Sequence, residues 1–214
     1  VLIEGKGNAF CAGGDVKSLS LSSNKNDLKK KFFQKEYTLN NAINEFSKKY
    51  LSIWNGIVMG GGVGLSIYGN YKIATEKTKF AMPETAIGFF PDVGGSYFLS
   101  KLEKGTGLFL ALTGTVINAR DVMDLGLATH YLLSEHIIEA KEKFINSGLI
   151  ETSNQYPEME SNIKKNENFI EDVFQNNLND IFIKLKNSNS EFGKKIYSLL
   201  LTRCPFSLAV TVNL

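Results

Sequence analysis

Two carboxylates stand in the most apolar, glycine-rich stretch of this sequence, FAMPETAIGFFPDVGGSYFL, residues 80–99. Glu84 follows a proline and precedes the apolar run TAIGFF, and Asp92 comes eight residues later. Apolar surroundings desolvate a carboxylate and strengthen it as a base, so Glu84 suits attack on a carbonyl carbon or activation of a water. A surface-loop carboxylate is the plainer interpretation, which its apolar neighbours disfavour. Asp92 is equally compatible with capping a helix that begins near Gly94.

Two glycine-containing segments indicate a second kind of chemistry. NGIVMGGGVGLSIYG follows the strand-like YLSIW, and FCAGGD closes another strand before Asp15, a suitable N-cap for the helix VKSLS. A glycine turn at a helix N-terminus presents unpaired backbone N–H groups, and two such turns supply the two donors of an oxyanion hole. Taken alone, the glycines also fit close packing of strand against helix. A dinucleotide fingerprint is not met, because Ile67 replaces the third glycine after Gly62 and Gly64.

The elements that must position these groups follow two sequence patterns, one in each part of the chain. Up to about Leu133, short apolar runs between glycines alternate with helix-compatible stretches, which is the pattern of an α/β domain. The predicted strands lie in VLIEG, YLSIWNG, YKIATE and KFAM. From Ser134 the texture changes to amphipathic helices in SEHIIEAKEKFINS, ENFIEDVFQNNLNDIFIKLKN and SEFGKKIYSLLLTR, with a polar loop or linker near 150–168. We expect an α/β core over 1–133 and a helical region over 134–214, each continuing beyond the sequence.

Charge and composition argue against several partners. The sequence holds 24 basic and 22 acidic side chains, a net charge of +2, which creates no field favouring nucleic acid or an anionic membrane. Only two of the basic residues are arginines, Arg120 and Arg203, which leaves little for bidentate base readout. No run approaches the roughly 18 apolar residues that a membrane-spanning helix needs. We expect neither a nucleic-acid nor a membrane partner.

Cysteine and histidine are equally sparse. Cys11 and Cys204 are too few for a disulfide framework and lack the spacing of a zinc site, which favours a reducing, intracellular setting. Cys11 fits a small buried residue at a strand end. His130 and His136 belong to no recognisable Cys/His dyad, and the carboxylates and histidines lack metal-ligand spacing. No metal site is predicted.

Three segments carry a family resemblance. AFCAGGDVK, NGIVMGGGVGLSI and FAMPETAIGFFPDVGG resemble the two oxyanion loops and the acid-bearing segment of the crotonase (enoyl-CoA hydratase/isomerase) superfamily. Within it, FFQKEYTLNNAI, MPETAIGFFPDVGGSYFL and ALTGTVINARDVMDLGLATHY resemble the 3-hydroxyisobutyryl-CoA hydrolase branch. The resemblance covers nearly the whole chain and is strongest from Gly5 to about Tyr131. It implies a crotonase-like (ClpP/crotonase) spiral of ββα units, here without its first strands, followed by a helical region.

The resemblance also implies an activity. It is hydrolysis of 3-hydroxyisobutyryl-CoA, or a close short 3-hydroxyacyl-CoA, to the free acid and CoA, a step of valine catabolism in mitochondria. CoA is part of this substrate, so no separate cofactor is expected, and the oligomeric state stays open. Two alternatives remain: an enoyl-CoA hydratase/isomerase, and a non-catalytic subunit of a larger assembly that keeps the fold.

Roles for individual residues follow from the same resemblance. The backbone N–H groups of Gly14 and Gly61 polarise the thioester carbonyl, Glu84 attacks it or activates a water, and Asp92 orients water or binds the 3-hydroxyl group. Glu36 in QKEYTLN contacts the acyl end of the substrate, although its composition alone indicates a solvated residue on a lysine-rich helix.

Two further positions follow from the family pattern. Ala12 is the candidate for backbone recognition of the CoA adenine. Hydratases of the superfamily use two glutamates, of which one matches Glu84 and the other falls on Gly64, which has no side chain. This difference makes hydration of a double bond the less favoured activity.

Overall fold

Two compact units make up the described chain. The computed structural model describes residues 1–21, 25–150 and 156–214. One unit combines Val1–Phe80 with Asn118–Met159, and the other combines Ala81–Ile117 with Glu160–Leu214. Each unit is therefore assembled from two stretches of the chain. The sequence pattern, in contrast, changes only once, from α/β to helical near residue 133.

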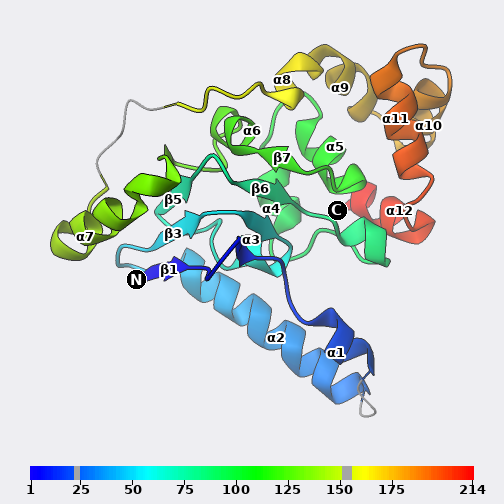
Figure 1. Ribbon diagram of the computed structural model, residues 1–214. Helices are drawn as coiled ribbons and strands as arrows, with labels where there is room; N and C mark the ends of the chain where they lie inside the picture. The colour runs from blue at the N-terminus through cyan, green and yellow to red at the C-terminus, as the bar shows by residue number, and fades with distance from the viewer. Residues whose placement is uncertain (22–24, 151–155) are drawn as a thin grey trace. The chain divides into compact units, whose positions relative to one another are not determined.

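The first unit is built on a parallel sheet. Its strands are β1 (Leu2–Glu4), β3 (Leu51–Trp54), β5 (Tyr71–Ala74) and β8 (His130–Tyr131), in the order β1-β3-β5-β8. The neighbouring strands β1, β3 and β5 can be followed in Figure 1. Each predicted strand motif contains one of the observed strands, because runs such as LSIW and YKIA are buried on both faces, as parallel sheets require.

The remaining strands alternate with these along the chain. They are β2 (Ala9–Cys11), β4 (Ile57–Met59), β6 (Lys79–Ala81) and β7 (Ile117–Asn118), and they form a second sheet in the order β2-β4-β6-β7. The chain passes between the two units at β6 and β7. Successive strand pairs thus place one strand in each sheet, which confirms the predicted repeat of two strands and a helix.

One glycine explains how a strand pair turns from one sheet to the other. Gly56 lies between β3 and β4 with φ of 107°, a conformation that L side chains rarely adopt. A Cβ atom added there would lie 2.1 Å from the Asn8 carbonyl oxygen. Glycine is therefore the residue that lets β4 follow β3 so closely.

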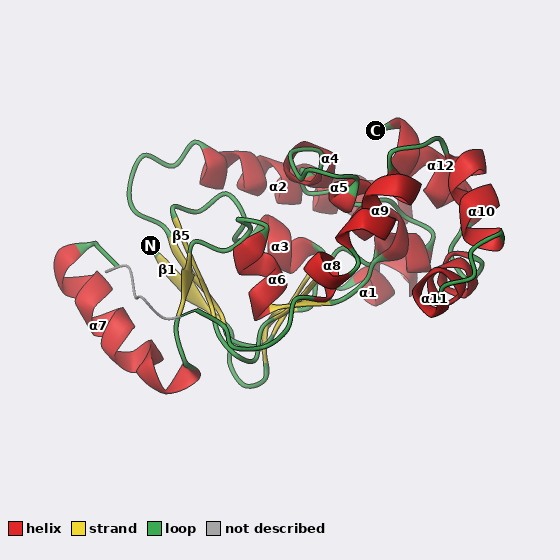
Figure 2. Cartoon of the chain, turned by 90° about the horizontal axis from the view of Figure 1, so that it is seen from above, coloured by secondary structure: helices red, strands yellow, loops and turns green. Residues whose placement is uncertain are grey.

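Helices of the first unit cover the sheet and carry part of the candidate site. They are α1 (Val16–Leu21), α2 (Lys25–Asn44), α3 (Gly61–Gly64), α6 (Ala119–Asp124), the 3₁₀ turn η2 (Ser134–His136) and α7 (Ile137–Ser147). Phe144 of α7 packs with Leu51, Ile53 and Ile73 in one hydrophobic cluster. Figure 2 shows α7 beside the strands of this sheet. This cluster anchors the strands whose continuations lead to the site.

The second unit is helical apart from its contributions to β6 and β7. It contains η1 (Glu84–Ile87), α4 (Gly95–Leu99), α5 (Thr106–Thr113), α8 (Asn162–Lys165), α9 (Glu167–Phe174), α10 (Leu178–Lys186), α11 (Glu191–Leu200) and α12 (Pro205–Asn213). The apolar helix α5 is its centre, with Phe109 in edge-to-face contact with Phe174 of α9 at 5.1 Å between ring centroids. From Ser134 on, the described residues form helices and no strand, as the sequence predicted.

Two details of the helical prediction are corrected. The stretch ENFIEDVFQNNLNDIFIKLKN is two helices, because Asn177 caps a new helix by accepting a hydrogen bond from the Asp180 N–H at 3.1 Å. The expected loop near 150–168 contains helix α8, whose N-terminus is capped by the Ser161 side chain. Residues 151–155 of that predicted loop lie outside the described residues.

Candidate active site

The first glycine segment forms a loop between β2 and α1. Strand β2 ends at Cys11, as predicted, but Cys11 is half-buried rather than buried. The exposed Ala12 then leads into Gly13, with φ of 113°. The Asp15 carboxylate accepts hydrogen bonds from the Ser18 N–H at 3.0 Å and the Ser18 hydroxyl at 2.6 Å, which confirms Asp15 as the cap of α1. These bonds hold the pKa of Asp15 below its usual value. The loop is thus fixed at both ends and leaves Gly14 exposed.

The second glycine segment joins β4 to α3. Gly60 is the N-cap of α3, with φ of 52°, and its carbonyl accepts the Val63 N–H at 2.8 Å. Gly61 then begins the helix and is half-buried, whereas Gly62 is buried against β2. Gly64, on which the second hydratase glutamate falls, is buried at the end of α3. The helix α3 thus lies on the glycines themselves, at Gly61–Gly64.

The two glycine loops meet in space. A Cβ atom added to Gly61 would lie 3.3 Å from the Gly14 backbone nitrogen, and one added to Gly13 would lie 3.7 Å from the Gly61 nitrogen. Two backbone amides at adjacent glycines can donate to one oxygen without any side chain in the way. The first unit therefore brings together the two residues that the sequence assigned to an oxyanion hole.

Helix α2 places two side chains against these glycines. The Glu36 Oε1 atom would lie 2.7 Å from a Cβ on Gly61, and the Phe32 Cζ atom would lie 2.7 Å from a Cβ on Gly14. Both side chains are half-buried and stand one helical turn apart. The structure places Glu36 half-buried against Gly61, a contact that composition alone does not reveal.

The second unit holds Glu84 in a buried turn. Glu84 is the first residue of η1 and only 5% exposed, and the next residue, Thr85, is fully buried. The Thr85 hydroxyl donates to the Leu112 carbonyl at 3.0 Å, and the Thr85 carbonyl accepts the Cys204 N–H at 3.1 Å. The interpretation of Glu84 as a surface-loop residue is therefore wrong, and its apolar neighbours were the correct signal.

Arg203 adds further hydrogen bonds near the turn that carries Glu84. The sequence analysis did not identify it as a site residue. Its Nε and Nη2 atoms donate to the Thr113 carbonyl at 3.0 and 2.6 Å. Thr113 ends α5, and helix α12 begins directly after Cys204. Arg203 and Cys204 thus tie the α11–α12 connection to α5 and to the turn that carries Glu84, a relation between residues too distant in sequence for a motif to reveal.

Asp92 lies in a strained turn. Its carbonyl accepts the Gly95 N–H at 2.6 Å, and the two residues between them have positive φ angles, 45° at Val93 and 80° at Gly94. A positive φ is costly for a β-branched residue, and such strain is concentrated at functional sites. The N-cap of α4 is Gly94, without a side-chain cap. Asp92 therefore does not occupy the N-cap position, as the alternative interpretation of Asp92 as a helix cap would require.

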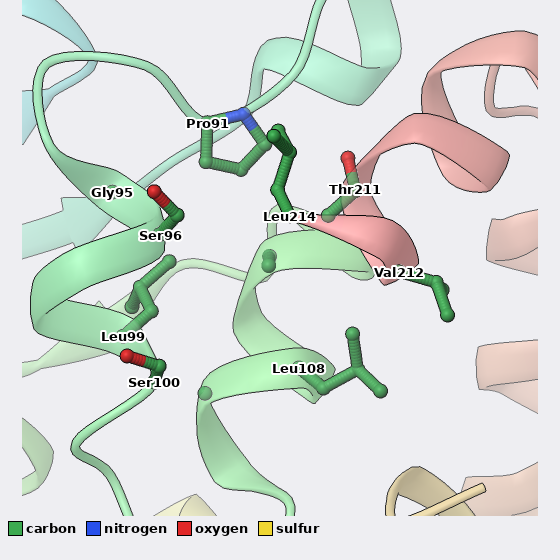
Figure 3. Close-up of a pocket in the computed structure, with 11 residues that line it drawn as sticks. Pro91, Gly95, Ser96, Leu99, Ser100, Leu108, Thr211, Val212 and Leu214 are labelled. Carbon is green, nitrogen blue, oxygen red and sulfur yellow. The ribbon is translucent and has the colours of Figure 1, made fainter. Parts of the chain in front are cut away.

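The second unit also contains a cavity of about 190 Å³ beside this turn (Figure 3). Its walls come from α4, α5 and α12 together with Pro91, and the lining is mostly apolar. Neither Glu84 nor Asp92 lines it. The cavity is therefore separate from the carboxylates in the second unit.

The two histidines lie away from the glycine loops in the chain. His130 lies in β8 and His136 at the end of η2, the late strand and helix start expected for them. Within residues 1–21, 25–150 and 156–214, no group of three metal-ligating side chains occurs. In the same described part of the chain, no helix has both the length and the apolar character that crossing a membrane demands.

Comparison with known proteins finds relatives along the whole chain. The sequence profile of a family described as enoyl-CoA hydratase/isomerase matches residues 1–214. The chain is 40% identical to the mitochondrial 3-hydroxyisobutyryl-CoA hydrolase of Gallus gallus, over 100% of this chain and 60% of the relative. It is 40% identical to the Dictyostelium discoideum protein of the same name, over 98% of this chain and 61% of that one.

Solved structures of related proteins share the fold of this chain. A carnitinyl-CoA dehydratase from Mycobacterium thermoresistibile superposes with a TM-score of 0.91 at 35% identity, and covers 100% of this chain and 64% of that one. An enoyl-CoA hydratase from Rhodobacter sphaeroides has a TM-score of 0.93 at 28% identity, with the same coverage. The chain spans about 60% of the length of the two 3-hydroxyisobutyryl-CoA hydrolases described above.

Proposed function

Because this chain belongs to the enoyl-CoA hydratase/isomerase family, we propose that its protein hydrolyses a short 3-hydroxyacyl-CoA thioester, 3-hydroxyisobutyryl-CoA first of all. The observation that carries the proposal is the meeting of Gly14 and Gly61, whose backbone amides lie side by side against Glu36. The names of the curated relatives support the choice of substrate. A conversion in valine catabolism and a mitochondrial location are part of the same proposal, and CoA belongs to the substrate.

The two glycine amides stabilise the charge that develops during thioester cleavage. Attack on the carbonyl carbon turns the carbonyl oxygen into an oxyanion, which accepts hydrogen bonds from the Gly14 and Gly61 N–H groups. Loss of one such donor typically raises a barrier by about 3 kcal/mol. The backbone of Ala12, exposed in the same loop, is the proposed contact for the CoA adenine.

Glu84 supplies the attack. As a nucleophile, its carboxylate oxygen bonds to the carbonyl carbon, the C–S bond breaks, and CoA leaves as the thiol after taking a proton; water then cleaves the anhydride to free acid and Glu84. As a general base, it removes a proton from the water that attacks the carbonyl directly. Asp92 orients this water or binds the 3-hydroxyl group, and Glu36 contacts the acyl end. Both routes consume one water and release one carboxylic acid and one CoA.

Hydration of an enoyl-CoA is the second candidate, and the fold likeness to the Rhodobacter sphaeroides enoyl-CoA hydratase supports it. The buried Gly64 opposes it, because no second glutamate stands at that position. A non-catalytic subunit is disfavoured by the presence of both acids and both oxyanion glycines together.

The first test is release of CoA thiol from 3-hydroxyisobutyryl-CoA by the full-length protein, with crotonyl-CoA as the competing substrate. Glu84→Gln is expected to lower the rate of thiol release by at least about 10³-fold, because the amide is neither a nucleophile nor a base. Glu103→Gln, at an exposed position of the same unit, is the matched control. Hydration of crotonyl-CoA without thiol release, or full activity in Glu84→Gln, contradicts the proposal.

A further inference from the structure

Asn40 is a buried amide with no hydrogen-bond partner among the described residues. It lies on α2 and is 6% exposed, and neither its Nδ2 nor its Oδ1 atom bonds to any described residue. Buried side-chain polar atoms in folded proteins nearly always have partners, because burying an unpaired amide is costly. The Asn40 amide therefore has its hydrogen-bonding capacity available for a ligand.

The position of Asn40 on α2 links it to the oxyanion glycines. Residues four apart lie above one another on a helix, so Phe32, Glu36 and Asn40 follow one another along one side. Phe32 meets Gly14 and Glu36 meets Gly61, and Asn40 comes one turn after Glu36. Ile43, near the end of α2, is also buried, so this side of α2 continues into the first unit. The unpaired amide is therefore a neighbour of the place where we propose that the acyl group binds.

The chemistry of the pair restricts what can bind there. An ionised Glu36 only accepts hydrogen bonds, whereas the Asn40 amide has two donor hydrogens and an acceptor oxygen. A carboxylate would be repelled by Glu36, and a methyl group would leave Asn40 unpaired. A hydroxyl group donates its hydrogen to Glu36 and accepts one from Asn40 Nδ2, which satisfies both side chains.

We propose that Asn40 is a specificity-determining residue that binds the hydroxyl group of a hydroxyacyl-CoA together with Glu36. The assignment rests on the proposed function, since it concerns the acyl group of that substrate. A site built to hydrogen-bond a hydroxyl discriminates strongly against the analogue that lacks it, because its buried polar groups are then left unpaired. Asn40 thus selects 3-hydroxyacyl over unsubstituted acyl thioesters of the same size.

The test compares two thioesters that differ only in the hydroxyl group, 3-hydroxyisobutyryl-CoA and isobutyryl-CoA. In the full-length protein, Asn40→Leu is expected to lower the ratio of the two kcat/KM values by roughly 10- to 100-fold. The loss falls on the hydroxylated substrate, and kcat/KM for isobutyryl-CoA stays within about threefold. The matched control is Asn41→Leu, at an exposed neighbouring position of α2, which leaves the ratio unchanged.

A stability measurement separates this role from a structural one. Leucine has the same branched shape as asparagine, with four side-chain heavy atoms and no polar atom to desolvate, so Asn40→Leu is expected to keep or raise the denaturation midpoint. Asn40→Ala, which removes the amide without adding bulk, is expected to reduce the substrate ratio in the same direction. A lowered midpoint together with an unchanged ratio in both variants means that Asn40 only supports the helix, and overturns the assignment.

The remaining outcomes are distinct. An unchanged ratio in an active Asn40→Leu enzyme overturns the role of Asn40 and leaves the proposed function standing. Absence of thiol release from either thioester by the unmodified full-length protein overturns the proposed function, and the assignment of Asn40 with it.

Discussion

Gly61 and Gly62 are neighbours in the sequence, yet a side chain at each would meet different surroundings. A Cβ on Gly61 approaches the end of the flexible Glu36 side chain at 2.7 Å and the Gly14 nitrogen at 3.3 Å, whereas one on Gly62 lies 2.3 Å from the Cys11 carbonyl oxygen. The first methyl group obstructs the proposed oxyanion hole, and the second overlaps fixed backbone of β2.

Gly61→Ala is therefore expected to lower kcat/KM for thioester hydrolysis by about 10²-fold, the effect of losing one oxyanion donor, with little change in stability. Gly62→Ala is expected to lower the free energy of unfolding by about 3 kcal/mol, because overpacked backbone must shift. Steady-state kinetics and urea denaturation of both variants check this contrast. Full activity in Gly61→Ala, or native stability in Gly62→Ala, would contradict it.

At the scale of elements, the turn that carries Glu84 depends on a connection far along the chain. Arg203 donates two hydrogen bonds to the last residue of α5, where a cation also complements the helix dipole. Thr85 bonds both to α5, through its hydroxyl, and to the residue after Arg203, through its carbonyl. These bonds hold η1, α5 and the start of α12 together within the second unit.

Arg203→Met is expected to destabilise the protein by about 2 kcal/mol, because the Thr113 carbonyl loses two charge-assisted donors. Arg203→Lys recovers part of this loss, since one ammonium replaces a two-pronged guanidinium. The urea midpoints of both variants are the measurement, with Lys195→Met, at an exposed position of α11, as the control. Equal stability of Arg203→Met and the unmodified protein would mean that these bonds do not hold the elements together.

At the scale of the whole molecule, one buried lysine makes stability depend on pH. Lys72 of β5 is 8% exposed and donates to the Gly69 carbonyl at 3.0 Å, and burial lowers its pKa to about 8. In the unfolded chain the pKa is 10.5. Below pH 8 both states are protonated and folding must desolvate the ammonium; above pH 10.5 both are neutral. The free energy of unfolding therefore gains a contribution as the pH rises from about 8 to 10.5.

Lys72→Met removes this dependence. At pH 7 the variant is expected to be more stable by about 2 kcal/mol, since the desolvation of a buried ammonium outweighs one hydrogen bond to a carbonyl. The advantage shrinks toward zero as the pH approaches 10.5. Denaturation curves of both proteins between pH 7 and 10.5 measure the difference, and a constant offset across this range would show that Lys72 is not buried as an ammonium at pH 7.

The sequence alone determined the local features of this protein. Short apolar runs between glycines gave the positions of the strands, because a buried parallel strand needs uninterrupted apolar residues. The glycine turns before α1 and α3 and the acids at Glu84 and Asp92 were visible as residue types at set spacings. Through its likeness to a family, the sequence also indicated the fold, which the solved structures confirm.

Only the tertiary structure decided which residues meet. The approach of Gly14 to Gly61, the packing of Phe32 and Glu36 on them, and the contact of Arg203 with Thr113 join residues 18 to 90 positions apart. The residue pattern within one helix does not show what packs against each of its faces. The sequence alone therefore left open whether Glu36 is solvated or contacts the glycine loops. The unpaired amide of Asn40 became visible for the same reason, since burial and hydrogen bonding depend on what packs against a residue and not on its neighbours in the chain.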